Sequence, residues 1–411
     1  MNNSEITVDP LAALTPETSS AVFARLRETH PIYWSRWLNG WVLTRYSHTL
    51  EALRNQNLQA DNPISRLERL ESRGGISLDN FKAILSTISF FTIPPDHDQI
   101  RRFLSKVFQK LDLASLPAQL ALRATVQLET GRLAGQIDLA ADFGRDLALY
   151  AIHKLLGIPL PDCHAVAEMA RAVALYFDAA PRPLGAILDA DKRLGGLLQY
   201  FRDLIHQRRL SPSNDGLSWM IRLAEDDLGV DDLQLAGFCA FFFVAGEETT
   251  ATAISRAMVM LAQRPDLRAN LVAQPALVPK AAKEFLRLTS SFQYVVRVPI
   301  RDLKIGSHEV RSGQNVVVVL AAANRDPEAF PDPDSIRFDR SGPEALAFGY
   351  GAYRCLGARM ATIELEAAIL ALSRVPDIQL AEPALSEMRL RVPALASARA
   401  RFATANSETC R

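Results

Sequence analysis

The sequence predicts a mainly α-helical protein with a small β component, an α+β fold class. Apolar residues recur at helical spacing through most of the 411 residues, most clearly over 98–115, 120–155, 163–208, 232–264, 266–288 and 356–374. Strand signals are confined to two short regions. Because no repeat, biased tract or long linker divides the chain, we expect one domain over 1–411, with an N-terminal arm over about 1–20 and a frayed tail over 404–411.

The first strand signal is a hairpin. Aromatic and β-branched residues at 32–34 and 41–44 flank Asn39-Gly40, and an Asn-Gly pair between such runs is typical of a turn between antiparallel strands. The second signal lies within 295–319, where the apolar run after Asn315 is typical of a buried strand. Prolines at 94–95, 159–161, 181–183 and 331–333 punctuate the rest of the chain.

The composition excludes several classes of protein. Apolar residues make up 48% of the chain and charged residues 22%, which is ordinary for a globular domain and unlike a disordered or fibrous chain. Lys+Arg and Asp+Glu are each 46, so the formal net charge is zero and nothing predicts a nucleic-acid or acidic-membrane partner. The apolar stretch from Ala236 to Gly246 is far shorter than the ~20 residues that span a bilayer.

The cysteines favour a reducing compartment. The four of them, Cys163, Cys239, Cys355 and Cys410, lie far apart and form no CxxC pair, which is unlike a zinc site or a disulfide framework. The N-terminal residues lack the basic stretch and apolar core of a secretory leader. We therefore expect a soluble cytoplasmic protein.

The most informative segment runs from Phe348 to Gly357, with the sequence FGYGAYRCLG. Gly349 and Gly351 precede Cys355, and Gly357 precedes a run with helical spacing. A cysteine just before a helix lies near free backbone N–H groups and the positive end of the helix dipole, which lower the pKa of its thiol. Glycines allow tight turns and a close approach of the backbone to a flat cofactor. The pattern predicts a thiolate that meets a bound group.

This segment resembles the haem-binding loop of the cytochrome P450 monooxygenases, whose pattern is F-G-x-G-x-H-x-C-x-G. The resemblance covers most of the chain and implies a single-domain cytochrome P450 fold, with haem b between the long central helix and the cysteine-loop helix. It implies that Cys355 is the axial ligand of the haem iron, with Phe348, Gly349 and Gly357 beside the haem. Tyr353 stands where a histidine that bonds a haem propionate is usual, so its hydroxyl would have to replace that donor.

A second motif, AGEETT at 245–250, lies inside the longest apolar helix. Polar groups in such a helix need partners or a function, and alone they are equally a charged patch where the helix reaches the surface. The segment is similar to the family's oxygen-activation motif A/G-G-x-D/E-T-T/S. The resemblance implies that Thr249 hydrogen-bonds dioxygen and that Glu248 delivers protons. It also implies that the small residues Ala245 and Gly246 leave room for dioxygen beside the haem.

Two further stretches match the family: one lies between these two motifs and the other lies before both. Glu284 and Arg287 share a helix face and match E-x-x-R, which implies a structural network with Arg340 that braces the cysteine loop. An isolated pair at this spacing is most often a solvated ion pair. The structural interpretation therefore rests on the position of this pair between the two motifs. The stretch PPDHDQIRR resembles P-P-x-H-x-x-x-R, which implies that His97 and Arg101 bind the haem propionates. The resemblance adds a third propionate contact from Arg297.

The resemblance also indicates which residues face the substrate. Apolar residues occupy these positions, which predicts a largely hydrophobic substrate: Phe241, Val244, Phe292, Val295 and Val296. Each is also compatible with plain core, evenly so for Phe241 and more strongly for Val296. The implied reaction inserts one oxygen atom of O2 by C–H hydroxylation or epoxidation, in the biosynthesis or catabolism of natural products.

The implied electron supply is NAD(P)H, acting through a reductase and a ferredoxin. Basic residues near the cysteine predict a docking patch for an acidic ferredoxin: Arg101, Arg102, Lys106, Arg354 and Arg359. We expect a monomer. Three other interpretations stay open from the sequence: a haem-thiolate sensor or binding protein without turnover, a P450 whose substrate is tethered to a carrier protein, and a hydrolase with Cys355 as nucleophile.

Overall fold

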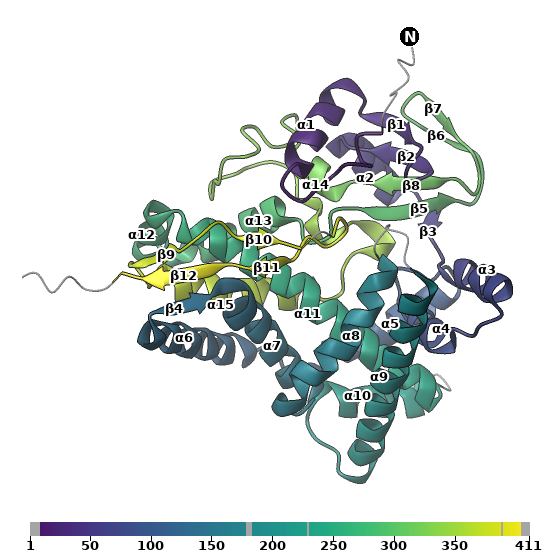
Figure 1. The fold of residues 1–411 in the computed structure, drawn as a ribbon, viewed down its shortest axis with the longest axis horizontal. Coiled ribbons are helices and arrows are strands. Elements are labelled where there is room, and N and C mark those ends of the chain that lie inside the picture. Colours follow the sequence, from purple (N-terminus) through teal and green to yellow (C-terminus); the bar gives the residue numbers. More distant parts are fainter. Residues whose placement is uncertain (1–8, 178–182, 228–229, 388, 404–411) are drawn as a thin grey trace, which may run out of the picture.

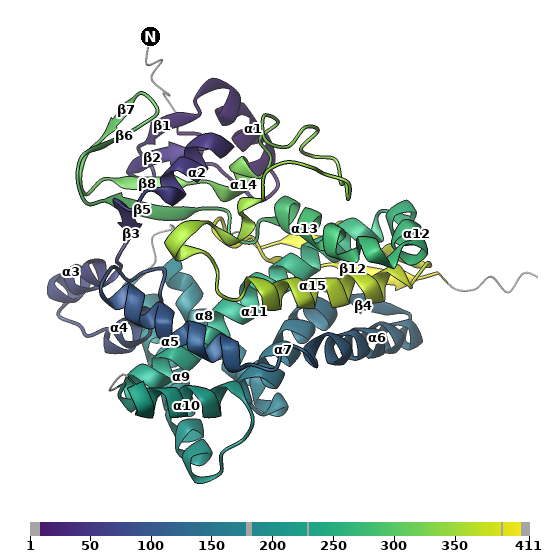
Figure 2. The same cartoon turned by 180° about the vertical axis from the view of Figure 1, so that it is seen from behind.

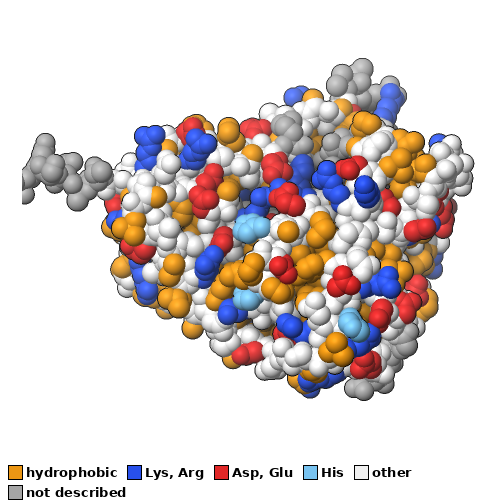
Figure 3. Space-filling model, turned by 60° about the horizontal axis from the view of Figure 1, so that its bottom comes forward, with side chains coloured by type: hydrophobic (Ala, Val, Ile, Leu, Met, Phe, Trp, Pro, Cys, Tyr) orange, Lys and Arg blue, Asp and Glu red, His pale blue; other side chains and the backbone are white. Residues whose placement is uncertain are grey.

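A computed structural model of the chain describes residues 9–177, 183–227, 230–387 and 389–403. The expected frayed tail over 404–411, with Cys410, and the first part of the expected N-terminal arm therefore lie outside the described residues. Helices dominate and the strands form small sheets, which confirms the predicted fold class (Figure 1). In the described ranges, no helix combines the length and the apolar character that a membrane span requires. Acidic and basic side chains are intermixed on the face in Figure 3.

The α-helices of the described residues are α1 (Ser19–Thr29), α2 (Tyr46–Arg54), α3 (Ile64–Gly74), α4 (Asp79–Leu85), α5 (Asp96–Lys110), α6 (Leu116–Ala134), α7 (Asp146–Leu156), α8 (Cys163–Phe177), α9 (Leu184–Leu210), α10 (Gly216–Asp227), α11 (Asp232–Ala262), α12 (Pro265–Ala273), α13 (Val278–Thr289), α14 (Leu320–Ala323) and α15 (Ala358–Ser373). A π-helix, η1 (Leu139–Arg145), and short 3-10 turns accompany them: η2 (Leu160–Asp162), η3 (Pro275–Leu277), η4 (Leu346–Phe348) and η5 (Gly351–Tyr353). The strands are β1 (Ile32–Ser35), β2 (Gly40–Leu43), β3 (Leu58–Ala60), β4 (Gln136–Asp138), β5 (Val295–Pro299), β6 (Leu303–Ile305), β7 (His308–Val310), β8 (Asn315–Val318), β9 (Ile378–Leu380), β10 (Leu385–Ser386), β11 (Leu395–Ser397) and β12 (Arg399–Phe402).

Three of the six predicted helical stretches are single helices, and three divide. The single ones are α5, α11 and α15. The stretch 120–155 divides because Gly135 takes a left-handed conformation, with φ 77°, after α6, and β4 and η1 follow before α7 begins. The stretch 266–288 divides into α12 and α13, where Pro275 begins a 3-10 turn. The stretch 163–208 is α8 and α9.

The predicted hairpin and the predicted buried strand belong to one sheet. Strands β1 and β2 pair antiparallel, from Ile32 opposite Leu43 to Ser35 opposite Gly40, and Asn39 in the turn has φ 47°, a conformation that asparagine tolerates. Strand β2 pairs parallel with β8, and β8 pairs antiparallel with β5, which gives the order β1-β2-β8-β5-β3. This sheet carries β5, and β5 brings Arg297 to the site.

Helix α11 runs through the middle of the molecule (Figures 1 and 2). Its first turn is held by a capping box, in which Asp231 accepts from the Gln234 N–H and the Gln234 side chain accepts from the Asp231 N–H. Its buried residues belong to two large hydrophobic clusters, one with α4, α5 and α9 and the other with α6, α13 and α15. Packing on both sides makes α11 a fixed platform for residues 245–250.

The chain that leads into α15 lies between the five-stranded sheet and α5 (Figure 2). We call residues 346–357 the cysteine loop. Its contacts reach three elements that are distant in sequence: a Cβ on Gly351 would lie 2.8 Å from the Leu53 oxygen of α2, Tyr353 meets β3, and Arg354 meets α5. The loop therefore sits where the sheet and the helices meet.

Candidate functional site

Two glycines set the shape of the cysteine loop. Gly349 and Gly351 have φ of 68° and 72°, a left-handed region that favours glycine, and a Cβ on Gly351 would collide with the Leu53 oxygen. The loop closes where the Cys355 N–H donates to the Phe348 oxygen at 2.9 Å. Helix α15 begins directly after this closure, because its N-cap, Gly357, lies two residues after Cys355.

The Cys355 thiol does not follow the simple prediction of a lowered pKa. The Gly357 N–H, Arg101 and Arg354 do lower the pKa of this thiol, but burial raises it by more, so the net shift is upward. Its side chain nevertheless retains accessible surface. The helix terminus alone therefore does not produce a thiolate. A metal ion at the sulfur would do so, because a coordinating thiol is deprotonated outright.

Tyr353 forms the centre of a stack of three side chains. The centroid of its ring lies 4.4 Å from the centroid of the His97 ring. The same centroid lies 4.5 Å from the central carbon of the Arg297 guanidinium group. The Tyr353 hydroxyl accepts from the Ala60 N–H at 3.2 Å and lies 3.4 Å from the Thr92 oxygen, to which it donates. Its one proton is thus directed to the protein. The expected hydrogen bond from this hydroxyl to a propionate stays a prediction, and the Tyr353 ring supports His97 and Arg297.

Arg297 and His97 present buried donors beside this ring. Arg297 is almost fully buried, and within the described residues it has no carboxylate partner; it donates to the Val296 oxygen at 2.9 Å. Burial lowers the pKa of Arg297 to about 10. His97 contacts Asp98 through Nδ1, while its buried Nε2 has no partner in the described part of the chain. An unpaired cation and an unpaired imidazole nitrogen are matched by an anionic ligand.

Arg101 ties α5 to the cysteine loop. Its Nη1 donates to the Arg354 oxygen at 2.7 Å, and the nearby Cys355 sulfur raises the pKa of Arg101 against the larger lowering by burial. Arg101 therefore lies close enough to the cysteine for their charges to interact.

Helix α11 turns two different faces to its surroundings at residues 245–250. Ala245 is exposed although its neighbours belong to the core, and the Thr249 hydroxyl donates to the Ala245 oxygen at 2.7 Å. Gly246 is buried, and a Cβ there would lie 3.4 Å from Ile152 and 3.6 Å from Met360. Ala245 thus has open space beside it, whereas Gly246 packs against α7 and α15. That Gly246 leaves room for dioxygen stays a prediction.

The two acids of this motif have different partners. Glu248 forms an ion pair with Arg389, from the chain between β10 and β11. Glu247 is buried, and its Oε1 lies 3.4 Å from Nε of Arg145, at the end of η1. Burial raises the pKa of Glu247 to about 7, helped by Glu248 and opposed by Arg145. The sequence singled out Glu248 and missed Glu247, whose signal was a second acid in an apolar helix.

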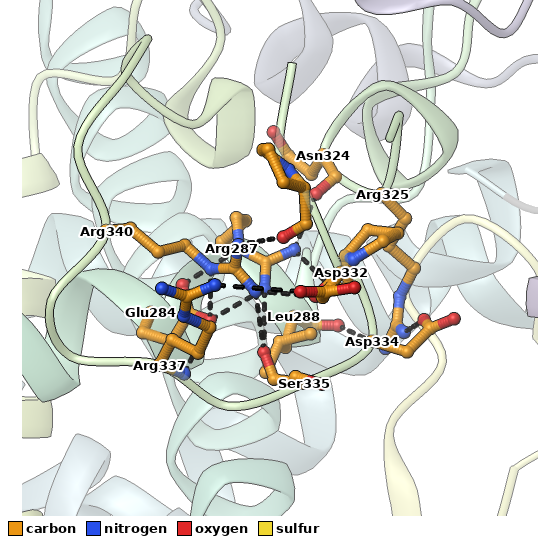
Figure 4. A network of polar contacts seen from close by, with 12 residues as sticks. Glu284, Arg287, Leu288, Asn324, Arg325, Asp332, Asp334, Ser335, Arg337 and Arg340 are labelled. Carbon is orange, nitrogen blue, oxygen red and sulfur yellow. Dashed lines mark hydrogen bonds and ion pairs between the residues drawn. The ribbon is translucent and has the colours of Figure 1, made fainter. Parts of the chain in front are cut away.

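The predicted E-x-x-R network is present as three buried or half-buried charges (Figure 4). Glu284 accepts from Arg287 at 2.7 and 2.9 Å and from Nε of Arg340 at 2.8 Å. Burial raises the pKa of Glu284, but the hydrogen bonds from the two arginines outweigh it and lower the pKa. Arg287 also donates to the Asn324 and Pro333 oxygens.

An aromatic cluster lies near the predicted substrate positions. The Phe90 ring lies 6.0 Å from the rings of both Phe241 and Phe292, so it joins two predicted positions that are 51 residues apart. Phe90 itself was missed, because the segment before α5 has no regular pattern. Val244 is half-buried beside the cluster that holds Phe241.

The two valines of β5 point to opposite faces of the sheet, because neighbouring strand residues alternate. Val295 shares its face with Arg297 and packs against the same buried cluster as Phe292, whereas Val296 packs against the cluster of Leu11 and Phe23. The structure therefore does not bring Val296 to the site.

Comparison with known proteins agrees with this arrangement. The family model described as cytochrome P450 matches residues 270–374. The chain is 32% identical to cytochrome P450-SU2 of Streptomyces griseolus over 350 residues, which cover 84% of this chain and 82% of that protein. The chain is a cytochrome P450. It is also 28% identical to the biotin biosynthesis cytochrome P450 of Bacillus subtilis, over 87% of this chain and 89% of the relative.

Solved P450 structures share the fold over nearly the whole chain. The crystal structure of P450BioI in complex with an acyl carrier protein that carries hexadec-9Z-enoic acid has a TM-score of 0.83 at 26% identity, over 94% of this chain and 99% of that one. The crystal structure of CalO2 has a TM-score of 0.86 at 25% identity, over 94% and 96%. This P450 is therefore an oxidoreductase of the monooxygenase type, which decides against the hydrolase and binding-protein interpretations.

Membership in the family implies a haem, and the residues present fit one. A P450 haem needs a thiolate ligand and partners for two propionates. Cys355 supplies an accessible sulfur beside Gly357. Among the described residues, Arg297 is a buried cation without a carboxylate partner, and the buried Nε2 of His97 has no hydrogen-bond partner.

We expect Arg287→Met to lower the free energy of unfolding by about 3–5 kcal/mol, because breaking a buried ion pair leaves the partner charge and carbonyl groups unmatched. Denaturant unfolding measures the loss. The matched control is Arg337→Met, since the Arg337 side chain is 43% exposed and pairs with Asp339, so its loss should lower stability far less. Equal costs for both variants would contradict the bracing role.

We expect Arg297→Met to raise the free energy of unfolding of the haem-free protein by about 1–3 kcal/mol, because it removes a buried donor that lacks a carboxylate partner. The same variant should retain haem less firmly. Unfolding of the haem-free protein and haem transfer to an acceptor protein measure the two effects. The exposed Arg301, changed to Met, should alter neither; a haem-free protein that is destabilised by Arg297→Met would overturn the interpretation.

Proposed function

We propose that this P450 inserts one oxygen atom of O2 into a largely hydrophobic small molecule, by C–H hydroxylation or epoxidation, in the metabolism of natural products. The observation that carries the proposal is the pair of buried donors, Arg297 and His97, on the ring of Tyr353, two residues from Cys355. These residues would hold haem b through its propionates and its iron. Arg101, Phe348, Gly349, Gly357 and Ala245 would surround it.

The haem, when bound, supplies the activation of O2 with two electrons, and the protein supplies position and protons. Thr249 donates its proton to the Ala245 oxygen, so its own oxygen is able to accept a hydrogen bond beside the open surface at Ala245. Glu248 is the neighbouring acid on α11, and it would pass protons towards Thr249 when its pair with Arg389 opens. We therefore assign Thr249 and Glu248 to proton delivery.

The side chains at the expected substrate positions indicate how polar the substrate is. Phe90, Phe241 and Phe292 form an apolar aromatic group, with Val244 and Val295 half-buried near it. Apolar walls of this kind favour a hydrophobic substrate.

We expect Thr249→Ala to keep haem binding while diverting most electrons from product to hydrogen peroxide, because the proton supply loses its last hydroxyl. NADPH use, peroxide and oxidised product are measured together. Thr250→Ala is a suitable control, since the neighbouring Thr250 is buried, whereas Thr249 is partly exposed. Unchanged coupling of electron use to product in Thr249→Ala would remove Thr249 from the mechanism.

We propose that electrons arrive from an acidic ferredoxin, supplied by an NAD(P)H-dependent reductase, at the basic residues around the cysteine. Arg102, Lys106 and Arg359 are exposed, and Arg354 is exposed while it pairs with Glu344 at 2.8 Å. Arg101 is engaged with the Arg354 oxygen, so it supports the patch less directly. Opposite charge accelerates the encounter of such partners.

We expect Arg359→Glu to slow the reduction of this P450 by an acidic ferredoxin at low salt and to weaken the salt dependence of the rate. The variant is chosen because an acid in the first turn of α15 is compatible with the helix dipole. Arg301→Glu, a charge reversal at an exposed site on the β5–β6 connection, is the control. Equal effects of the two variants on reduction would contradict docking at the patch.

A second candidate is a substrate tethered to an acyl carrier protein. The observation that favours it is the similarity, over 94% of this chain, to the structure of P450BioI with its acyl carrier protein. Spin-state titration with a carrier-bound acyl chain and with the free acid separates the two candidates: a shift with the free molecule alone excludes the carrier.

A further inference from the structure

A small polar cavity lies against α11 beside the two acids of the AGEETT motif. It has a volume of about 20 Å³, enough for one water molecule, and Glu247, Glu248 and Thr252 line it from α11. Three arginines also line it: Arg145 from η1, Arg171 from α8 and Arg389 from the β10–β11 connection. Charged side chains from four elements therefore converge on one point.

The polar atoms around this cavity are incompletely satisfied. Three buried ones have no hydrogen-bond partner within the described ranges: Thr252 Oγ1, Arg171 Nη2 and Arg389 Nε. All three belong to residues that line the same cavity. Buried polar groups normally have partners, so this grouping indicates a hydrated space. The three arginine side chains are 20–35% exposed, which connects the cavity to the surface.

The two acids around the cavity differ in charge. Glu248 forms an ion pair with Arg389. Glu247 is buried, with a single cation at 3.4 Å, and its pKa of about 7 keeps part of the population protonated at neutral pH. Arg171, the third cation, pairs with Glu168, and Arg389 also pairs with Glu387 at 2.6 Å. Glu247 is thus the acid best placed to hold an exchangeable proton.

We propose that Glu247 is a proton reservoir, which takes protons from solvent through the arginine-lined cavity and passes them to Glu248. This inference rests on the proposed role of Glu248 and adds an earlier residue to the route. In each transfer Glu247 loses one proton and becomes a carboxylate stabilised by Arg145, while Glu248 gains that proton and releases its pair with Arg389. Glu248 then passes this proton on towards Thr249 and re-forms its pair with Arg389. A hydronium ion from the solvent reprotonates Glu247, so each cycle carries one proton from solvent to Thr249 and restores both acids.

The test is an infrared pH titration of the haem-loaded full chain. The C=O stretching band of a protonated carboxyl should disappear with a midpoint near pH 7 and should be absent from Glu247→Gln. Glu364 is the matched control: it is fully buried, and burial raises its pKa far above the ordinary value, so Glu364→Gln should remove a band that does not titrate near neutral pH. If Glu247→Gln leaves the titrating band in place, the proposal is wrong.

A second variant secures the result should Glu247→Gln fold poorly. Arg145 is partly exposed and lies beside Glu247, and a cation favours the charged form of an acid. Arg145→Gln should therefore move the midpoint of the band to higher pH, and an unmoved midpoint would contradict the assignment.

Turnover separates a proton reservoir from a merely structural acid. Glutamine preserves the shape of a neutral carboxyl, so Glu247→Gln should leave unfolding unchanged but should lower the rate of product formation and abolish its dependence on pH near 7. Wild-type rate and pH dependence in Glu247→Gln would overturn the reservoir. The infrared result requires no turnover, so failure of the proposed monooxygenase function, seen as no product from the wild type, is distinguishable from failure of this inference.

Discussion

The buried ion pair between Glu284 and Arg287 is the interaction on which the geometry of the site depends. The pair lies on α13. Arg287 also donates to the backbone oxygens of Asn324 and Pro333. Arg340, which binds Glu284, donates to the Ser335 oxygen in the irregular chain that follows α14. Asn324 then accepts from the Leu346 N–H at 2.6 Å, at the first residue of the cysteine loop. A continuous series of hydrogen bonds therefore runs from a packed helix to the loop that carries Cys355.

Such a network suits a site that regular secondary structure does not provide. The chain between α14 and α15 has only two short 3-10 turns among its described residues, so its carbonyl groups need side-chain donors instead of ladder partners. Arginine supplies several donors from one planar group. A buried ion pair adds little to stability compared with apolar packing, but it fixes direction, and removing one partner is costly. The network thus contributes position to the site more than free energy.

The sequence predicted the cysteine loop, the network and the motif on α11 because each is a local pattern with a fixed spacing. It could not predict partners that the fold brings from afar. Arg389 approaches Glu248 across 141 residues, and Phe90 joins Phe241 and Phe292 from a segment without periodicity. The sequence also could not predict how the surroundings of a side chain affect it. Burial outweighed the helix terminus at Cys355, and the Ala60 and Thr92 backbone engaged the hydroxyl of Tyr353.

The central claim is that Cys355 binds haem iron as a thiolate, although burial alone disfavours the charged sulfur. The most direct measurement is the absorption spectrum of the purified, reduced protein with carbon monoxide, for the wild type and for Cys355→Ser. Our account predicts a strongly red-shifted Soret band that is lost in the variant. A Soret band at the position of histidine- or thiol-ligated haem, or no haem even after haem supplementation during expression, would contradict it.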